Sequence, residues 1–124
     1  MSVAVDISGY IQSAGIATLG TDMFIGYQPE TPYNTVTLYE TGGYPLDKAG
    51  FLQYPTLQVI VRNESYGAAR SKIDSIINLL HRTTNTTINS TKYCSIYTTG
   101  DATSLGKDDQ NRSRLSVNFE LKGS

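Results

Sequence analysis

The stretch that decides the fold is Leu115-Ser116-Val117-Asn118-Phe119-Glu120-Leu121, in which apolar and polar residues alternate strictly. Successive side chains of a β-strand point to opposite faces. The apolar members therefore share one face, and the other face carries Ser116, Asn118, Glu120 and Lys122. This alternation predicts a strand that is buried on one side only, so other elements must cover its apolar face.

Two segments have the apolar periodicity of α-helices and are candidates for that cover. The first spans about residues 3 to 15, with a possible N-cap at Asp6 and the apolar residues Ile7, Tyr10, Ile11 and Ala14. The second follows a possible N-cap at Ser65, and its apolar stripe comprises Tyr66, Ala69, Ile73, Ile76, Ile77 and Leu80. A helix of about 15 residues is marginal alone in water, so the second helix is expected to dock on the sheet.

Shorter apolar or alternating runs predict further strands within residues 23–27, 35–39, 57–62 and 93–98. The polar runs at 83–91 and 100–112 are interpreted as connecting loops, because Asn, Gly and Asp favour turns. Together these elements predict one domain over residues 1–124 with an α+β fold. We expect a two-layer sandwich, in which a mixed, mainly antiparallel sheet carries both helices on one face. The other face is expected to be wet, with polar side chains at Thr35, Thr37, Tyr39, Gln58, Arg62, Ser116, Asn118 and Glu120.

Composition argues against several classes of protein. A chain of 124 residues with a formal net charge of -1 lacks the basic excess of a protein that grips nucleic-acid phosphates. The sequence does not begin with a basic segment and a long apolar run, and it has no stretch of about 18 apolar residues. Neither secretion nor membrane insertion is therefore expected. The single cysteine, Cys94, is interpreted as a small buried hydrophobe, and one thiol suits a reducing cytoplasm.

No set of residues in the sequence fits a catalytic, cofactor or metal site, and we expect no enzyme activity. The only histidine, His81, lies at the predicted end of the second helix, where a cation would complement the helix dipole. Asp101, Asp108 and Asp109 could touch a metal ion, but they lack the regular offsets and the closing bidentate acid of a calcium loop. Gly42-Gly43 is not followed by the Lys-Ser/Thr of a phosphate-binding loop and is interpreted as a turn.

Two segments are better suited to contact other proteins. The long connection over residues 40–55 has aromatic side chains beside it and within it, namely Tyr39, Tyr44, Phe51 and Tyr54. Long loops are usually functional or disordered, and tyrosine is common in interface cores, so a partner contact and packing over the sheet edge both fit. In the charged turn at residues 105–112, Asp108 and Asp109 can pair with Arg112 or Arg114, either within one subunit or across a boundary.

Four motifs follow one another over about residues 20 to 121. They are Tyr39-Glu40-Thr41-Gly42-Gly43, the strand Gln58-Val59-Ile60-Val61-Arg62, the helix start Tyr66-Gly67-Ala68-Ala69, and Leu105-Gly106 with Asp108 and Arg112 leading to Asn118-Phe119. In this order and spacing they resemble the tail terminator and minor capsid proteins of long-tailed bacteriophages, the group that includes the lambda-type tail terminator. The resemblance implies a structural virion protein, a homohexameric ring that caps the tail tube, stops its growth and faces the head. The segment 83–91 departs from this pattern.

The resemblance also implies partners and a location. The partners would be further copies of the chain, the major tail tube protein and a head-tail connector or stopper protein, with DNA only passing through the ring lumen and no membrane contact. The protein would lie in the tail-neck region of the virion, after assembly in the host bacterial cytoplasm. We expect the interface residues to be Tyr39, Glu40, Gly42, Gly43, Tyr44, Phe51, Tyr54, Arg62, Asp108, Asp109, Arg112 and Arg114. The substitution Arg112→Glu is then expected to leave folding nearly unchanged and to prevent tail capping.

Two other functions also fit the sequence. A different neck component, such as a head-completion or stopper protein, would share the virion setting but bind the portal side. A cytoplasmic α+β module that binds a small ligand or RNA would be a monomer with a pocket and would not associate with tails.

Overall fold

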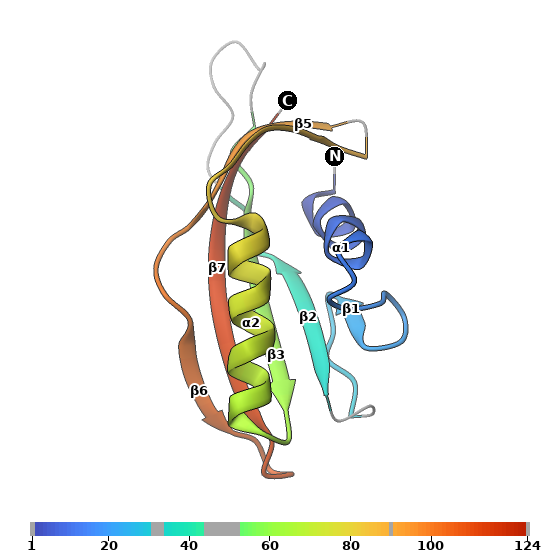
Figure 1. Cartoon of the computed structure of the whole chain (residues 1–124), viewed down its shortest axis with the longest axis vertical. Helices are drawn as coiled ribbons and strands as arrows, with labels where there is room; N and C mark the ends of the chain where they lie inside the picture. Colours follow the sequence, from blue (N-terminus) through green and yellow to red (C-terminus); the bar gives the residue numbers. More distant parts are fainter. Residues whose placement is uncertain (1, 31–33, 44–52, 90, 124) are drawn as a thin grey trace.

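The computed structural model in Figure 1 describes residues 2–30, 34–43, 53–89 and 91–123. Two helices, α1 (Val3–Ser13) and α2 (Tyr66–Leu80), pack on one face of a seven-stranded sheet. Its strands are β1 (Met23–Ile25), β2 (Thr35–Glu40), β3 (Thr56–Asn63), β4 (Thr83–Ile88), β5 (Thr91–Thr98), β6 (Thr103–Lys107) and β7 (Ser113–Gly123). They lie in the order β1-β2-β3-β7-β5-β4, with β6 beside β7. Only the β1–β2 pair is parallel among the described strands, so the predicted α+β sandwich with a mixed, mainly antiparallel sheet is confirmed.

Strand β7 holds the sheet together because it pairs along both of its edges. One edge runs antiparallel to β3, from Asn63 opposite Ser113 to Thr56 opposite Glu120. The other edge pairs with β6 near its start and with β5 near its end. The dry face predicted for this strand is confirmed, since no more than 3% of the surface is exposed at any of Leu115, Val117, Phe119 and Leu121.

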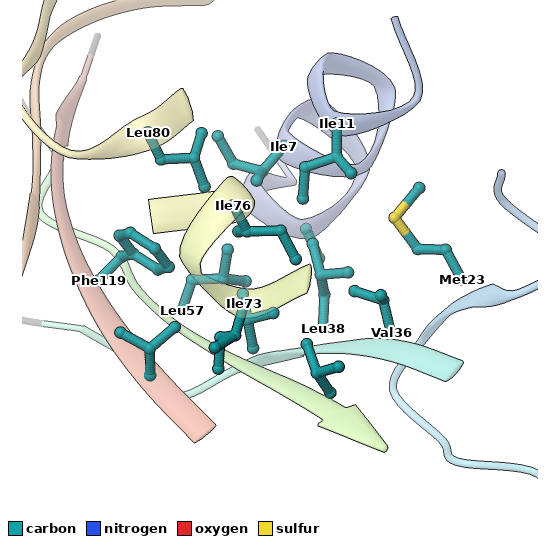
Figure 2. Packing of buried hydrophobic residues seen from close by; sticks show 14 of the residues in the cluster. Ile7, Ile11, Met23, Val36, Leu38, Leu57, Ile73, Ile76, Leu80 and Phe119 are labelled. Carbon is teal, nitrogen blue, oxygen red and sulfur yellow. The ribbon is translucent and has the colours of Figure 1, made fainter. Parts of the chain in front are cut away.

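The core lies between the helices and the sheet, as Figure 2 shows. Its fully buried members include Ile7, Ile11, Ile73, Ile76 and Leu80 from the helices and Leu38, Leu57 and Phe119 from the strands. Burying one large apolar side chain contributes about 1.5–3 kcal/mol before conformational entropy is subtracted. The apolar face of α2 therefore holds this helix to the sheet. Two members of the predicted stripe differ, because Tyr66 is 53% exposed and Ile77 is only partly buried.

The two helices begin with serine caps. The Ser65 hydroxyl accepts a hydrogen bond from the Ala68 N–H (3.3 Å), which confirms the predicted cap of α2. For α1 the prediction was wrong, because the cap is Ser2 and Asp6 is buried inside the first turn. The Asp6 carboxylate instead accepts hydrogen bonds from the Tyr93 hydroxyl (2.6 Å) and the Asn89 side-chain amide (3.1 Å). Burial and this bond to Asp6 raise the pKa of Tyr93, so its proton stays in place.

The interpretation of residues 83–91 as a loop is wrong. Residues Thr83–Ile88 form β4, which pairs with β5 as a hairpin that arches over the helices in Figure 1. Threonine favours extended backbone, and pairing with β5 satisfies peptide groups that a loop would leave to water. Asn85 and Asn89 take positive φ values of 49° and 50°, a conformation that asparagine tolerates better than most residues.

The second polar run, residues 100–112, also contains a strand that the sequence did not predict. β6 pairs with the start of β7, and a register shift separates Ser104 from Gly106. A similar irregularity between Tyr93 and Ser95 interrupts the alternation of β5. Cys94 lies at this point and is only partly buried, so its predicted role as a buried hydrophobe is corrected.

The sheet face away from the helices is wet only in part. Four residues predicted to be outward and wet are at most 5% exposed, namely Thr35, Thr37, Arg62 and Ser116. One cause is the segment after β1, because the Arg62 guanidinium donates to the backbone carbonyls of Pro29 and Glu30. Asn118 and Glu120 are exposed as expected, and Tyr39 and Gln58 are partly buried. The prediction of a uniformly solvated face is therefore wrong at the end of the sheet that carries Arg62.

Candidate assembly interface

Of the residues predicted to contact partners, those that the structure describes lie at two opposite ends of the sheet. In the β2–β3 pair, Glu40 lies opposite Leu57 at one end and Thr35 lies opposite Arg62 at the other. Arg62 in turn lies opposite Arg114 of β7, beside the charged turn. Because each strand residue advances about 3.3 Å, the length of β2 separates the two groups. The predicted residues therefore form an arginine end and an aromatic end, and the structure does not bring them into one site.

At the arginine end, the Arg112 side chain is buried and hydrogen-bonded within its own subunit. Its side chain is 4% exposed, its Nε donates to Asp108 Oδ2 (2.8 Å), and its Nη1 donates to the Glu30 carbonyl (2.7 Å). Asp108 also accepts from the backbone N–H groups of Gln110 and Arg112, both at 3.0 Å. Of the two pairings that the sequence left open, the one seen here is within the subunit. The turn is thus a closed unit that joins β6 to β7.

The charges at this end perturb one another. Burial, followed by repulsion from Arg112, lowers the pKa of Arg62, because both disfavour its charged form. Desolvation tends to raise the pKa of Asp108, but hydrogen bonds from Arg112 and Gln110 outweigh it and hold this pKa below its usual range. Asp109 is exposed, and Arg114 is partly exposed with a buried Nε that has no acceptor within the described residues. Asp109 and Arg114 are thus the members of this end best placed to reach another molecule.

At the aromatic end, Tyr44 and Phe51 lie outside the described residues. Tyr39 and Tyr54 are partly buried. The Glu40 carboxylate has a structural role, because its Oε1 accepts hydrogen bonds from the Ser2 hydroxyl (2.9 Å) and the Ala4 N–H (3.0 Å). A carboxylate at the start of α1 also complements the helix dipole. The end of β2 is therefore tied to the first turn of α1.

The turn at Gly42-Gly43 requires glycine for two different reasons. Both residues have positive φ, 96° at Gly42 and 90° at Gly43. A Cβ at Gly42 would meet no atom within 4 Å, whereas one at Gly43 would collide with the Tyr54 carbonyl oxygen and lie 2.8 Å from Pro55 Cα. The positive φ values agree with the interpretation of Gly42-Gly43 as a turn.

We expect Gly43→Ala to destabilise the protein more than Gly42→Ala. Gly42→Ala introduces only the strain of a left-handed backbone, about 1–2 kcal/mol. Gly43→Ala adds to that strain a collision with the backbone of residues 54 and 55. Urea unfolding followed by circular dichroism measures both free energies. Equal losses in the two variants would contradict the close approach of these two segments.

The histidine and the acidic residues do not form a chemical centre in the described part of the chain. His81 Nδ1 accepts a hydrogen bond from the Thr98 N–H (3.1 Å), so the ring is tied to the end of β5. Asp101 pairs with Arg70 (3.3 Å). Among the described residues no group of three His, Cys, Asp or Glu side chains could hold a metal ion. Of the helices described, none has the length and apolar character needed to span a membrane.

A groove that the sequence did not predict lies between α1 and the end of β4. It has a volume of about 550 Å³, and its lining includes Val5, Gly9, Leu19 and Ile88. Val5 and Leu19 are 47% and 45% exposed, which is unusual for large apolar side chains that lie close together. Sequence reasoning missed this groove because residues 83–91 were interpreted as a loop, which left α1 without a neighbour on this side.

Comparison with known proteins gives one family and one fold. Residues 10–124 match the family model described as bacteriophage tail terminator protein. Among solved structures, the fold is similar to that of a chain from the virion of a native gene transfer agent (GTA) particle, with a TM-score of 0.76 at 12% identity. The aligned region covers 98% of this chain and 94% of that chain. At this identity the likeness shows the fold alone. A comparison with the sequences of curated proteins found no match.

Proposed function

Because the chain belongs to the bacteriophage tail terminator proteins, we propose that it closes the phage tail tube as a homohexameric ring. In this role it stops the polymerisation of the tube and forms the tail side of the head-tail junction. The observation that supports the proposal most strongly is the family match over residues 10–124, which includes both sheet ends and nearly the whole core. The family is structural rather than enzymatic.

The proposal implies several contacts with other phage proteins. One surface of the ring would meet the major tail tube protein, and the opposite surface would meet a head-tail connector or stopper protein. DNA would pass through the lumen without being bound, in keeping with a net charge of -1. We propose the virion neck as its location and the host bacterial cytoplasm as the place of assembly.

The residues at the two sheet ends differ in how accessible their side chains are to a partner protein. Asp109 and Arg114 at the arginine end, and Tyr39 and Tyr54 at the aromatic end, offer at least partly exposed side chains to a partner. Arg112 acts by holding the charged turn in shape rather than by direct contact, because its guanidinium is engaged within the chain. We propose that the partner surfaces contain Asp109, Arg114, Tyr39 and Tyr54.

Inactivation of the gene in the phage tests this role. If the chain terminates the tube, cells infected with the inactivated phage should accumulate tails of variable and excessive length, measured by negative-stain electron microscopy. A plasmid copy of the wild-type chain should restore a single tail length. Tails of normal length that fail to join heads would contradict termination and would point to a stopper or head-completion protein.

A further inference from the structure

Acidic and basic residues are distributed unevenly along the chain. Residues 1–47 contain no lysine or arginine, and their acidic residues are Asp6, Asp22, Glu30, Glu40 and Asp47. All 10 lysine and arginine residues lie after position 47. In the structure, α1, β1 and β2 lie at one side of the sheet, and β6 and β7 lie toward the other (Figure 1). We call these sides the α1 flank, whose helix and strands carry no lysine or arginine, and the β6 flank, whose strands carry Lys107, Arg114 and Lys122.

The α1 flank carries the groove between α1 and β4. Its exposed apolar side chains are Val5 and Leu19, and a Cβ on Gly9 would meet no atom within 4 Å. Gly9 thus leaves open space in the middle of the helix surface. Asp22 lies nearby, because its Oδ1 accepts a hydrogen bond from the N–H of Thr18, the residue before Leu19. The exposed surface of the groove is mainly apolar, and Asp22 lies beside it in a separate hollow that Arg62 and Lys72 also line.

The β6 flank carries an exposed strand. All residues of β6 are exposed, and within the described part of the chain this strand pairs only with β7. Leu105 is 40% exposed at the middle of β6, and Lys107 is exposed at its end. A strand with a free edge and a projecting apolar side chain is a surface that proteins usually cover.

We propose that β6 of one copy docks against the groove of the α1 flank on the next copy, with Leu105 entering the groove and Lys107 facing Asp22 beside it. This inference rests on the proposed ring. A closed ring of more than two copies uses a heterologous contact, in which two different surfaces of each copy meet. The two flanks satisfy this condition because they lie on opposite sides of the sheet, differ in charge and offer an apolar side chain to an apolar groove.

Filling the groove should block this contact without harming the fold. Gly9→Leu places a side chain where no atom lies within 4 Å, and leucine favours helix more than glycine does. We expect the urea midpoint to be unchanged or higher, while the concentration needed to cap tail tubes rises by at least about tenfold. The matched control is Asn78→Leu, which adds the same side chain to an exposed position of α2. Normal capping by Gly9→Leu would contradict the proposal.

Cross-linking distinguishes this interface from the function of the ring. In a Cys94→Ser background, Ser13→Cys places a thiol in the groove and Ser104→Cys places one beside Leu105, both by near-isosteric changes at exposed positions. Tails carrying both cysteines, treated with a short bismaleimide, should give a ladder of covalent oligomers. The pair Ser75→Cys and Ser104→Cys, with Ser75 on the exposed face of α2, should not. Tails of normal length without a ladder would overturn the proposed interface and leave tube termination standing. Tails of normal length from phage in which the gene is inactivated would instead count against the function itself.

Discussion

Ile73→Asp is expected to leave no folded protein. Ile73 is fully buried in the middle of α2, where it faces the sheet within the core. An unpaired carboxylate in this position costs several kcal/mol, and the loss of apolar packing adds to that cost. Small domains have a total stability of about 5–15 kcal/mol, so the variant should be insoluble or should lack a cooperative unfolding transition. Solubility after expression and circular dichroism measure the outcome.

The control for this experiment is Asn78→Asp, which introduces the same carboxylate on the exposed side of the same helix. It should fold like the wild type, because its charge remains solvated and changes stability by only a few tenths of a kcal/mol. A folded Ile73→Asp protein would show that α2 presents a different face to the sheet, and the core in Figure 2 would then be wrong.

Arg112→Glu is expected to destabilise the monomer by about 3–5 kcal/mol, the usual cost of breaking a buried ion pair. The new carboxylate would lie among oxygen atoms, namely the Asp108 carboxylate and the Glu30 carbonyl that now accept from the guanidinium. This reverses the expectation from sequence, in which Arg112 served assembly and its loss spared folding. Urea unfolding measures the free energy. An unchanged midpoint would contradict the burial of this side chain.

Asp109→Lys is the matched control, because it also changes the charge by two units in the same turn but at an exposed side chain. Its unfolding free energy should stay close to that of the wild type. If tail capping is lost in this variant while stability is kept, the arginine end belongs to a partner surface.

Patterns with a strong period were sufficient to predict the layers of the fold. Residues 115–121 alternate over several strand positions, and the apolar stripe of α2 repeats over several helical turns. One residue assigned to the wrong face, such as Tyr66, therefore does not change the prediction. β4 was missed because its threonines and its asparagine carry no apolar period. What makes this segment a strand is the backbone pairing with β5, a long-range interaction that local composition does not contain.

The candidate site was less predictable, because it depends on which polar groups are buried. Arg62 and Arg112 look like surface charges in the sequence, yet backbone carbonyls of Pro29 and Glu30 remove them from solvent. Asp6 looks like a helix cap and instead binds Tyr93 from a strand far along the chain. One signal was available from sequence, namely the absence of lysine and arginine before Lys48, and it divides the molecule into the two flanks.

The central claim, that this chain closes the tail tube as a ring, is tested most directly by electron cryomicroscopy of the head-proximal ends of mature tails. Averaged images should contain a closed hexameric ring, stacked on the last ring of tube protein, into which the fold of Figure 1 fits with its core intact. The density should show β6 of each copy against α1 of its neighbour. A tube that ends in bare tube protein, or this chain located on the portal side of the neck, would contradict the claim.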